Sequence, residues 1–170
     1  MTVIEVLVSS ALAVVILGGA VMLLQSADEL ASSSARTTAV ASKADGVVWQ
    51  IAQDLRRSTL SSAAKADGTG FFDGDADTGM SFALVGGYDG STVVRGDTIS
   101  YRFVLPAGAT EGEIFRDQNG TSRLVARKIT DFSISRTRSM FRVSVTAVAG
   151  PNDDRARRAT ATANILPRNP

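Results

Sequence analysis

The sequence lacks two residue types on which much enzyme chemistry depends, because its 170 residues include no cysteine and no histidine. Without cysteine there are no disulfides, thiol nucleophiles or thiolate metal sites, and without histidine there is no Ser-His-Asp triad. The glycine-rich stretch of residues 63–80 also lacks the Lys-Ser/Thr ending of a phosphate-binding loop. We therefore expect no enzymatic activity, no cofactor and no bound metal.

A large excess of charge of either sign is also missing. The chain has 18 Lys and Arg against 17 Asp and Glu, for a net charge of +1. Proteins that hold nucleic acid usually show a strong basic excess, so a nucleic-acid partner is not expected. The charges are nevertheless unevenly spread, because no Lys or Arg precedes Arg36 and Glu5 is the only charged residue before Asp28.

This distribution leaves an uncharged and mostly apolar run of 22 residues, from Val6 to Ala27. As an α-helix the run would be about 33 Å long, close to the hydrocarbon thickness of a bilayer. A carboxylate inside a membrane helix costs roughly 2.5 to 3.5 kcal/mol, so Glu5 needs a partner. Residues 1–5 hold this acid and none of the basic residues that begin a secretory signal peptide.

Two interpretations of the apolar run then remain. The first is a plain single-pass anchor, which explains the length of the run and leaves Glu5 unexplained. The second is a helix that leaves the bilayer and packs against copies of itself. In that dry environment Glu5 would pair with the terminal amine of a neighbouring subunit.

The N-terminus resembles that of mature type IV pilins and type II secretion pseudopilins; it is Met1-Thr2-Val3-Ile4-Glu5-Val6-Leu7-Val8. The family pattern is Phe-Thr-Leu-Ile-Glu before an apolar run, so Thr2, Ile4 and Glu5 match. The resemblance implies that a prepilin peptidase removes a basic leader, that the new amino terminus at Met1 is methylated, and that Thr2 and Glu5 serve processing and assembly. It also implies a bacterial inner-membrane precursor and a helical filament that spans the periplasm or lies outside the cell. The implied partners are copies of this chain, related pilins and the pilus assembly machinery.

Two features of many major pilins are missing, namely Pro at the position of Met22 and Gly near Val14. Within the apolar run only the pair Gly18-Gly19 disfavours a helix, since each glycine in a helix interior costs about 1 kcal/mol of helix stability relative to alanine. The pair is consistent with close packing of helices through small residues. It is equally consistent with a place where the helix stretches or unwinds in a filament.

Residues 26–62 predict a helical continuation with an amphipathic second half. Apolar and small residues follow helical spacing along one stripe: Ala41, Ala44, Val48, Ile51, Ala52, Leu55 and Thr59. The opposite face is expected to carry the polar residues Ser42, Lys43, Asp45, Gln53, Asp54 and Arg57. Trp49 is expected to pack the helix against the sheet or against a neighbour. Residues 1–62 are thus predicted to form one long helix.

Residues 63–170 predict an antiparallel β head. Gly68, Gly70, Gly74 and Gly79 mark a loop over residues 63–80, and the periodicity then changes from 3.6 to 2. Strands are expected at residues 99–105, at residues 113–116 and 122–126 around the hairpin signal Asn119-Gly120, from Phe132, over residues 141–147, and over residues 159–166. The predicted fold is α+β and pilin-like, with a membrane-spanning or filament-core segment 1–25, an amphipathic helix 26–62 and the head 63–170.

Segments of the head resemble J-type minor pseudopilins and the related W-type minor pilins. The similar segments are Asp54-Leu55-Arg56-Arg57, Ile99-Ser100-Tyr101-Arg102-Phe103, the hairpin from Phe115-Arg116 to Leu124-Val125, Ile129-Thr130-Asp131-Phe132, and the terminal Arg168-Asn169. This resemblance favours a minor subunit over a major one.

Three groups of charged side chains in the head, one acidic and two basic, are candidate binding sites. Asp73, Asp75 and Asp77 have the spacing of the first half of a calcium loop, but Thr78 and Leu84 stand where that loop needs Gly and Glu. We therefore favour an acidic turn over a calcium site. The arginines at 136, 138 and 142, and those at 155, 157 and 158, lack the interleaved aromatics of single-strand nucleic-acid sites, so we favour solvated strand edges.

The sequence thus supports two functional hypotheses of different classes. The first is a structural subunit of a type IV pilus or pseudopilus that assembles through its N-terminal helix. The second is a membrane-tethered β domain that binds DNA, calcium or secreted cargo without polymerising. Glu5 separates them, because a simple tether has no evident use for a carboxylate at that position.

Overall fold

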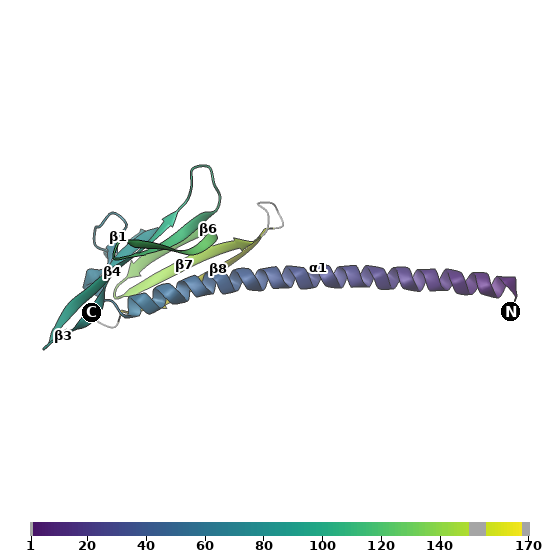
Figure 1. Ribbon diagram of the computed structural model, residues 1–170, viewed down its shortest axis with the longest axis horizontal. Helices are drawn as coiled ribbons and strands as arrows, with labels where there is room; N and C mark the ends of the chain where they lie inside the picture. The colour runs from purple at the N-terminus through teal and green to yellow at the C-terminus, as the bar shows by residue number, and fades with distance from the viewer. Residues whose placement is uncertain (1, 150–155, 168–170) are drawn as a thin grey trace. The chain divides into compact units, whose positions relative to one another are not determined.

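The computed structural model describes residues 2–149 and 156–167 (Figure 1). The chain groups into two compact units, Met1–Thr38 and Ala39–Pro170. A single helix, α1, runs through both units from Val3 to Arg56. The remaining elements are η1 (Leu60–Ser62), β1 (Ala64–Lys65), β2 (Ala76–Asp77), β3 (Gly79–Asp89), β4 (Thr92–Val104), β5 (Gly112–Gln118), β6 (Thr121–Thr137), β7 (Met140–Ala149) and β8 (Arg157–Ile165). The predicted α+β class, a long N-terminal helix packed on an antiparallel sheet, is confirmed.

The second unit is an antiparallel sheet covered on one face by the last turns of α1. The strands lie in the order β1-β3-β4-β5-β6-β7-β8, with β2 paired to β6. One core joins the helix to the sheet, and its largest fully buried side chains are Ile51, Leu55, Met80, Phe82, Ile99, Tyr101, Ile114, Ile129, Phe132, Ile134, Phe141 and Ile165. The alternation is clean over residues 140–147 of β7, since Phe141, Val143, Val145 and Ala147 are buried and the residues between them are not. Such alternation is typical of an antiparallel sheet with one dry face.

The predicted stripe of the amphipathic helix is largely confirmed. Ala44, Val48, Ile51, Ala52 and Leu55 are all buried, and they are joined by Val40 and Val47. The end of the helix was predicted wrongly, however, because α1 stops at Arg56 and does not reach residue 62.

The local hydrogen bonds explain this earlier end. The Ser58 hydroxyl donates to the carbonyl of Leu55 at 2.8 Å, and the Arg57 carbonyl accepts from the backbone of Val85 in β3 at 2.8 Å. A serine hydroxyl and a strand amide therefore take up carbonyl groups at the end of the helix. Thr59 is buried as expected, but it lies outside the helix.

The strands differ from the prediction in several places. The short β1 and β2 lie in the stretch predicted as a loop, and β4 begins at Thr92, seven residues before the predicted strand. β3 was not predicted, although Met80, Phe82 and Leu84 alternate along it and are buried. β6 is one long strand and includes both predicted segments, 122–126 and the one from Phe132. Its pairing shifts register near Ile129, next to Lys128, whose φ of 60° is unusual for a residue with a side chain.

Two places in the sheet restrict which residues fit there, one through its backbone conformation and the other through a close contact. Asn119 and Gly120 join β5 to β6 with φ values of 52° and 75°, as the primed hairpin turn demands, so the predicted hairpin is confirmed. At Gly112 a Cβ atom would lie 2.5 Å from the ring of Phe103 and equally close to the carbonyl of Val104. A side chain at position 112 is therefore sterically excluded.

Candidate functional site

The start of α1 carries the residues predicted to serve assembly. The Thr2 backbone N–H donates to the Glu5 carboxylate at 2.7 Å, and the Glu5 backbone N–H donates to the Thr2 hydroxyl at 3.4 Å. These two hydrogen bonds form a capping box, which satisfies amide groups that a helix start leaves without partners. Glu5 therefore has a local partner that was not predicted, although the spacing Thr-x-x-Glu signals it. Met1, the third predicted residue, lies outside the described residues.

The apolar first part of α1 is entirely bare in the structure. The most apolar 18-residue window of the helix has a mean hydropathy of 2.5, and none of it is buried. Ile16, for example, is 66% exposed. Within residues 2–149 and 156–167, one helix is therefore long and apolar enough to cross a membrane, which bears out the coarse part of the predicted localisation.

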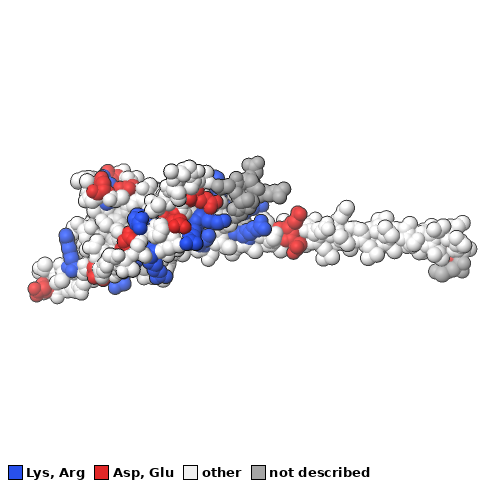
Figure 2. All heavy atoms as spheres, turned by 45° about the horizontal axis from the view of Figure 1, so that its top comes forward, with Lys and Arg blue, Asp and Glu red and all other residues white. Residues whose placement is uncertain are grey.

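This part of α1 is also continuous through the glycine pair. Gly18 and Gly19 are both helical, and a Cβ atom built at either position meets no atom within 4 Å. In Figure 2 the helix carries almost no coloured spheres along this stretch, whereas red and blue spheres are spread over the second unit. The side of the helix at these glycines is thus open to close approach by another helix.

A buried polar cluster joins the end of α1 to the sheet, and its centre is Asp54. The Asp54 carboxylate accepts hydrogen bonds from the Tyr101 hydroxyl at 2.7 Å and from Nε of Arg116 at 2.8 Å. Asp54 is only 8% exposed. Its prediction on the solvent face of the helix was therefore wrong, because a carboxylate with two strong donors can be placed inside the core.

The cluster continues outward to the protein surface. Nη1 of Arg116 donates to Gln118 at 2.7 Å, and the Gln118 side-chain amide donates to Asp97 at 2.8 Å. Burial and the hydrogen bond to Asp54 raise the pKa of Tyr101 far above its ordinary value. Burial alone would lower the pKa of Arg116, but the contact with Asp54 outweighs it and raises that pKa. Both side chains thus keep their protons over the whole physiological range, which suits a structural connection.

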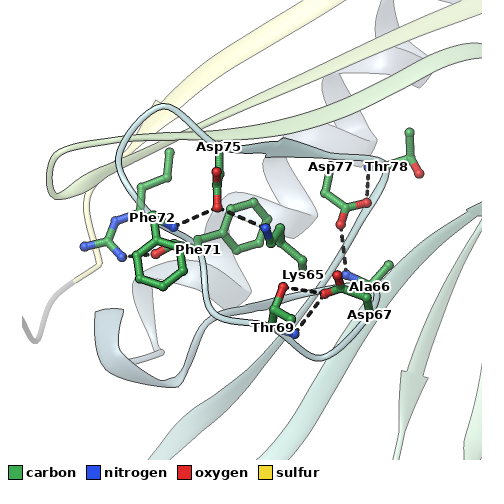
Figure 3. Close-up of polar contacts among 10 residues, drawn as sticks. Lys65, Ala66, Asp67, Thr69, Phe71, Phe72, Asp75, Asp77 and Thr78 are labelled. Carbon is green, nitrogen blue, oxygen red and sulfur yellow. Dashed lines mark hydrogen bonds and ion pairs between the residues drawn. The ribbon is translucent and has the colours of Figure 1, made fainter.

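The acidic loop after β1 holds its carboxylates apart (Figure 3). Asp75 accepts from the backbone of Phe72 at 3.0 Å and lies 3.1 Å from Nζ of Lys65. Asp77 accepts from the backbone of Ala66 and Thr78, and Asp73 accepts from the backbone of Arg138 at 2.7 Å. Each carboxylate thus fixes a different piece of backbone. Within residues 2–149 and 156–167, no three acidic side chains gather as metal ligands.

The first basic group is engaged in structural contacts as well. Arg136 donates to the carbonyls of Phe71 and Arg138, and Arg142 donates to the Asn164 side chain at 3.1 Å. In the second group, Arg157 and Arg158 belong to the exposed start of β8, whereas Arg155 lies outside the described residues. Arg136 and Arg142 are thus engaged in contacts within the second unit, and the described arginines of the second group lie on β8.

Trp49 does not pack on the sheet. It lies on the face of α1 that points away from the buried Val48 and Ile51, and 64% of its surface is exposed. Trp49 was expected to contact either the sheet or a neighbouring molecule, and only the contact with a neighbour stays a prediction.

The residues that carry the family resemblance at the N-terminus therefore form a helix start with a bare apolar helix behind it. A comparison with protein-family models finds no match, and comparisons with curated proteins and with solved structures find no significant similarity.

Proposed function

We propose that this protein is a structural subunit of a helical filament of the type IV pilus or pseudopilus kind, and that it assembles through the first part of α1. The observation that carries the proposal is the bare apolar helix on a chain whose second unit has a complete core of its own. Each Å² of apolar surface left in water costs about 25 cal/mol, so this helix needs a cover. A bilayer covers it before assembly, and equivalent helices of other subunits cover it afterwards.

In this proposal the chain is a single-pass protein of the bacterial inner membrane before assembly. It is processed by a prepilin peptidase and methylated at its amino terminus, and the assembly machinery then transfers it to a filament of this chain and related pilins. Glu5 pairs with the terminal amine of the adjacent subunit there, in a dry environment where an unpaired charge is costly. The role includes no catalysis and no nucleic-acid partner.

A second candidate function is a membrane-tethered β domain that binds DNA, calcium or secreted cargo. One observation favours it, namely the capping box of Thr2 and Glu5, because a cap gives Glu5 a use in a helix that never assembles. The two candidate functions therefore depend on different properties of the Glu5 side chain. Assembly needs its negative charge, whereas a cap needs only a hydrogen-bond acceptor.

Two substitutions at position 5 separate these properties. Glu5→Gln retains an acceptor that suits a capping box and removes the charge, whereas Glu5→Ala removes both. We expect both variants to reach wild-type levels in the membrane and to lose filaments alike, measured as sheared surface filaments or as cross-linked oligomers. Wild-type assembly of Glu5→Gln would contradict the ion pair. A wild-type chain that stays in the membrane and forms no filaments would favour the tethered domain.

A further inference from the structure

The outer face of α1 in the second unit carries one large apolar side chain. Val48, Ile51 and Leu55 are buried against the sheet, and Trp49 lies on the opposite side of the helix with 64% of its surface exposed. It is the only tryptophan of the chain. Tryptophan gains more from burial than most side chains and is enriched at the energetic centres of protein interfaces.

The helix surface next to Trp49 leaves room for a partner. Gly46 lies one turn before Trp49, and a Cβ atom built there meets no atom within 4 Å. Ser42 lies one further turn away and is exposed as well. Small residues beside a single bulky one let another helix approach closely and contact the tryptophan ring.

The charges on this face indicate which partner fits. Asp45 and Arg56 flank Trp49 on the exposed side of α1, and neither one forms an ion pair within the described part of the chain. They lie eleven residues apart, which is about 16 Å along a helix. A parallel copy displaced by that distance would place its Asp45 beside Arg56 of the first copy and its Thr38 level with Trp49 of the first copy. The opposite charges at the two ends of this face thus suit a staggered second copy.

We infer that the face of α1 formed by Ser42, Asp45, Gly46, Trp49 and Arg56 is a contact surface for a second copy of this chain, with Trp49 at its centre. The inference rests on the proposed function, because a filament sets copies of α1 parallel and staggered. It adds to that function a specific contact outside the apolar run. Assembly then depends on the second unit of the chain as well as on the first.

The single tryptophan allows a direct test with the full-length protein. Acrylamide quenching of Trp49 fluorescence is compared between the detergent-solubilised monomer and isolated filaments. We expect strong quenching in the monomer and several-fold weaker quenching in filaments, with the emission shifted to shorter wavelength. Filaments whose Trp49 is quenched as strongly as in the monomer would overturn the inference and leave the proposed function standing. Failure to form any filament would overturn both.

Variants test the same surface independently. Trp49→Ala is expected to lower filament yield about tenfold, as the loss of an interface centre does. The matched control is Phe72→Ala, which removes an aromatic ring that is 70% exposed on the acidic loop and should keep the wild-type yield. Asp45→Arg and Arg56→Glu should each reduce assembly, and the double variant should restore it. Equal yields from Trp49→Ala and Phe72→Ala, or no rescue by the double variant, would overturn the inference.

Discussion

Ile16 and Ile51 are the same residue type in the same helix, yet Ile16 is 66% exposed and Ile51 is fully buried. The difference lies in what surrounds each part of α1. Around Ile51 the chain supplies its own cover in the form of the sheet, and the polar residues of the helix mostly face solvent. Around Ile16 nearly every side of the helix is apolar, and the described part of the chain provides no cover.

The comparison indicates that the two parts of α1 suit different surroundings: one part packs on the sheet of its own chain, and the other needs lipid or other helices. A helix that folds onto its own sheet needs an apolar stripe on one side only. A helix that is apolar all round needs a surrounding that is apolar all round, which means lipid or other helices. The four predictions that follow test this division, beginning with the largest expected effect.

Removal of residues 1–25 should abolish membrane association and leave the second unit folded. The physical reason is that the deleted residues contribute nothing to the core of the second unit. Membrane fractionation and thermal unfolding measure the two effects, and the expected product is a soluble monomer. A truncated chain that unfolds, or one that still forms filaments, would contradict the division.

Matched alanine substitutions at the two isoleucines should have opposite consequences. Ile51→Ala is expected to lower the free energy of unfolding of the second unit by about 2 to 5 kcal/mol, because it leaves a cavity in the core. Ile16→Ala should leave that stability unchanged and weaken association only. Chemical denaturation of both variants in detergent checks the pair, and a similar loss of stability in both would break the comparison.

The Asp54 cluster should contribute to the stability of the second unit, as Ile51 does. Asp54→Asn leaves the Arg116 charge without its counter-ion and is expected to cost about 2 to 4 kcal/mol of unfolding free energy. The milder control Tyr101→Phe keeps the ring and removes one hydrogen bond to the carboxylate, at a cost of about 1 to 2 kcal/mol. Denaturation curves for both variants test this order. An Asp54→Asn variant as stable as wild type would show that the cluster is dispensable.

The acidic loop should give the smallest effect, and one that depends on pH. The hydrogen bond from the Phe72 backbone and the charge of Lys65 lower the pKa of Asp75 below its usual 3.8. A lowered folded-state pKa contributes stability above the unfolded-state value, and the contribution is lost as the pH falls through the folded pKa. Asp75→Asn should therefore melt slightly below wild type at pH 7, and the gap should close in acid. A gap that stays constant with pH would rule out this role of the carboxylate.

The fold could be predicted from the sequence wherever one residue pattern had a single structural solution. The alternation of Phe141, Val143 and Val145 can be satisfied only by a half-buried strand, and Asn119-Gly120 by a primed turn. The failures fall where partners distant in sequence decide the outcome. Asp54 looks like a surface residue until Tyr101 and Arg116 are brought to it by the sheet.

The ends of elements were hard to predict for the same reason. α1 ends at Arg56 partly because a strand amide from Val85 reaches the carbonyl of Arg57, a contact with no local signal. The features of the candidate site also differ in how clearly the sequence signals them. The apolar run and its length can be read from the sequence, and the spacing Thr-x-x-Glu also signals the capping box of Thr2 and Glu5. The exposure of Trp49 follows from the predicted stripe, because position 49 lies outside the run of Ala44, Val48, Ile51, Ala52 and Leu55.

The central claim is that copies of this chain cover the apolar part of α1, and the lack of cysteine makes a direct measurement possible. Ile16→Cys introduces the only thiol of the chain. In assembled material we predict cross-linking of neighbouring subunits by a short bismaleimide and protection from a water-soluble maleimide. The matched variant Ser61→Cys, at an exposed position after the end of α1, should react with the water-soluble reagent before and after assembly. An Ile16→Cys variant whose thiol stays uncross-linked and reacts freely with that reagent in assembled material would contradict the claim.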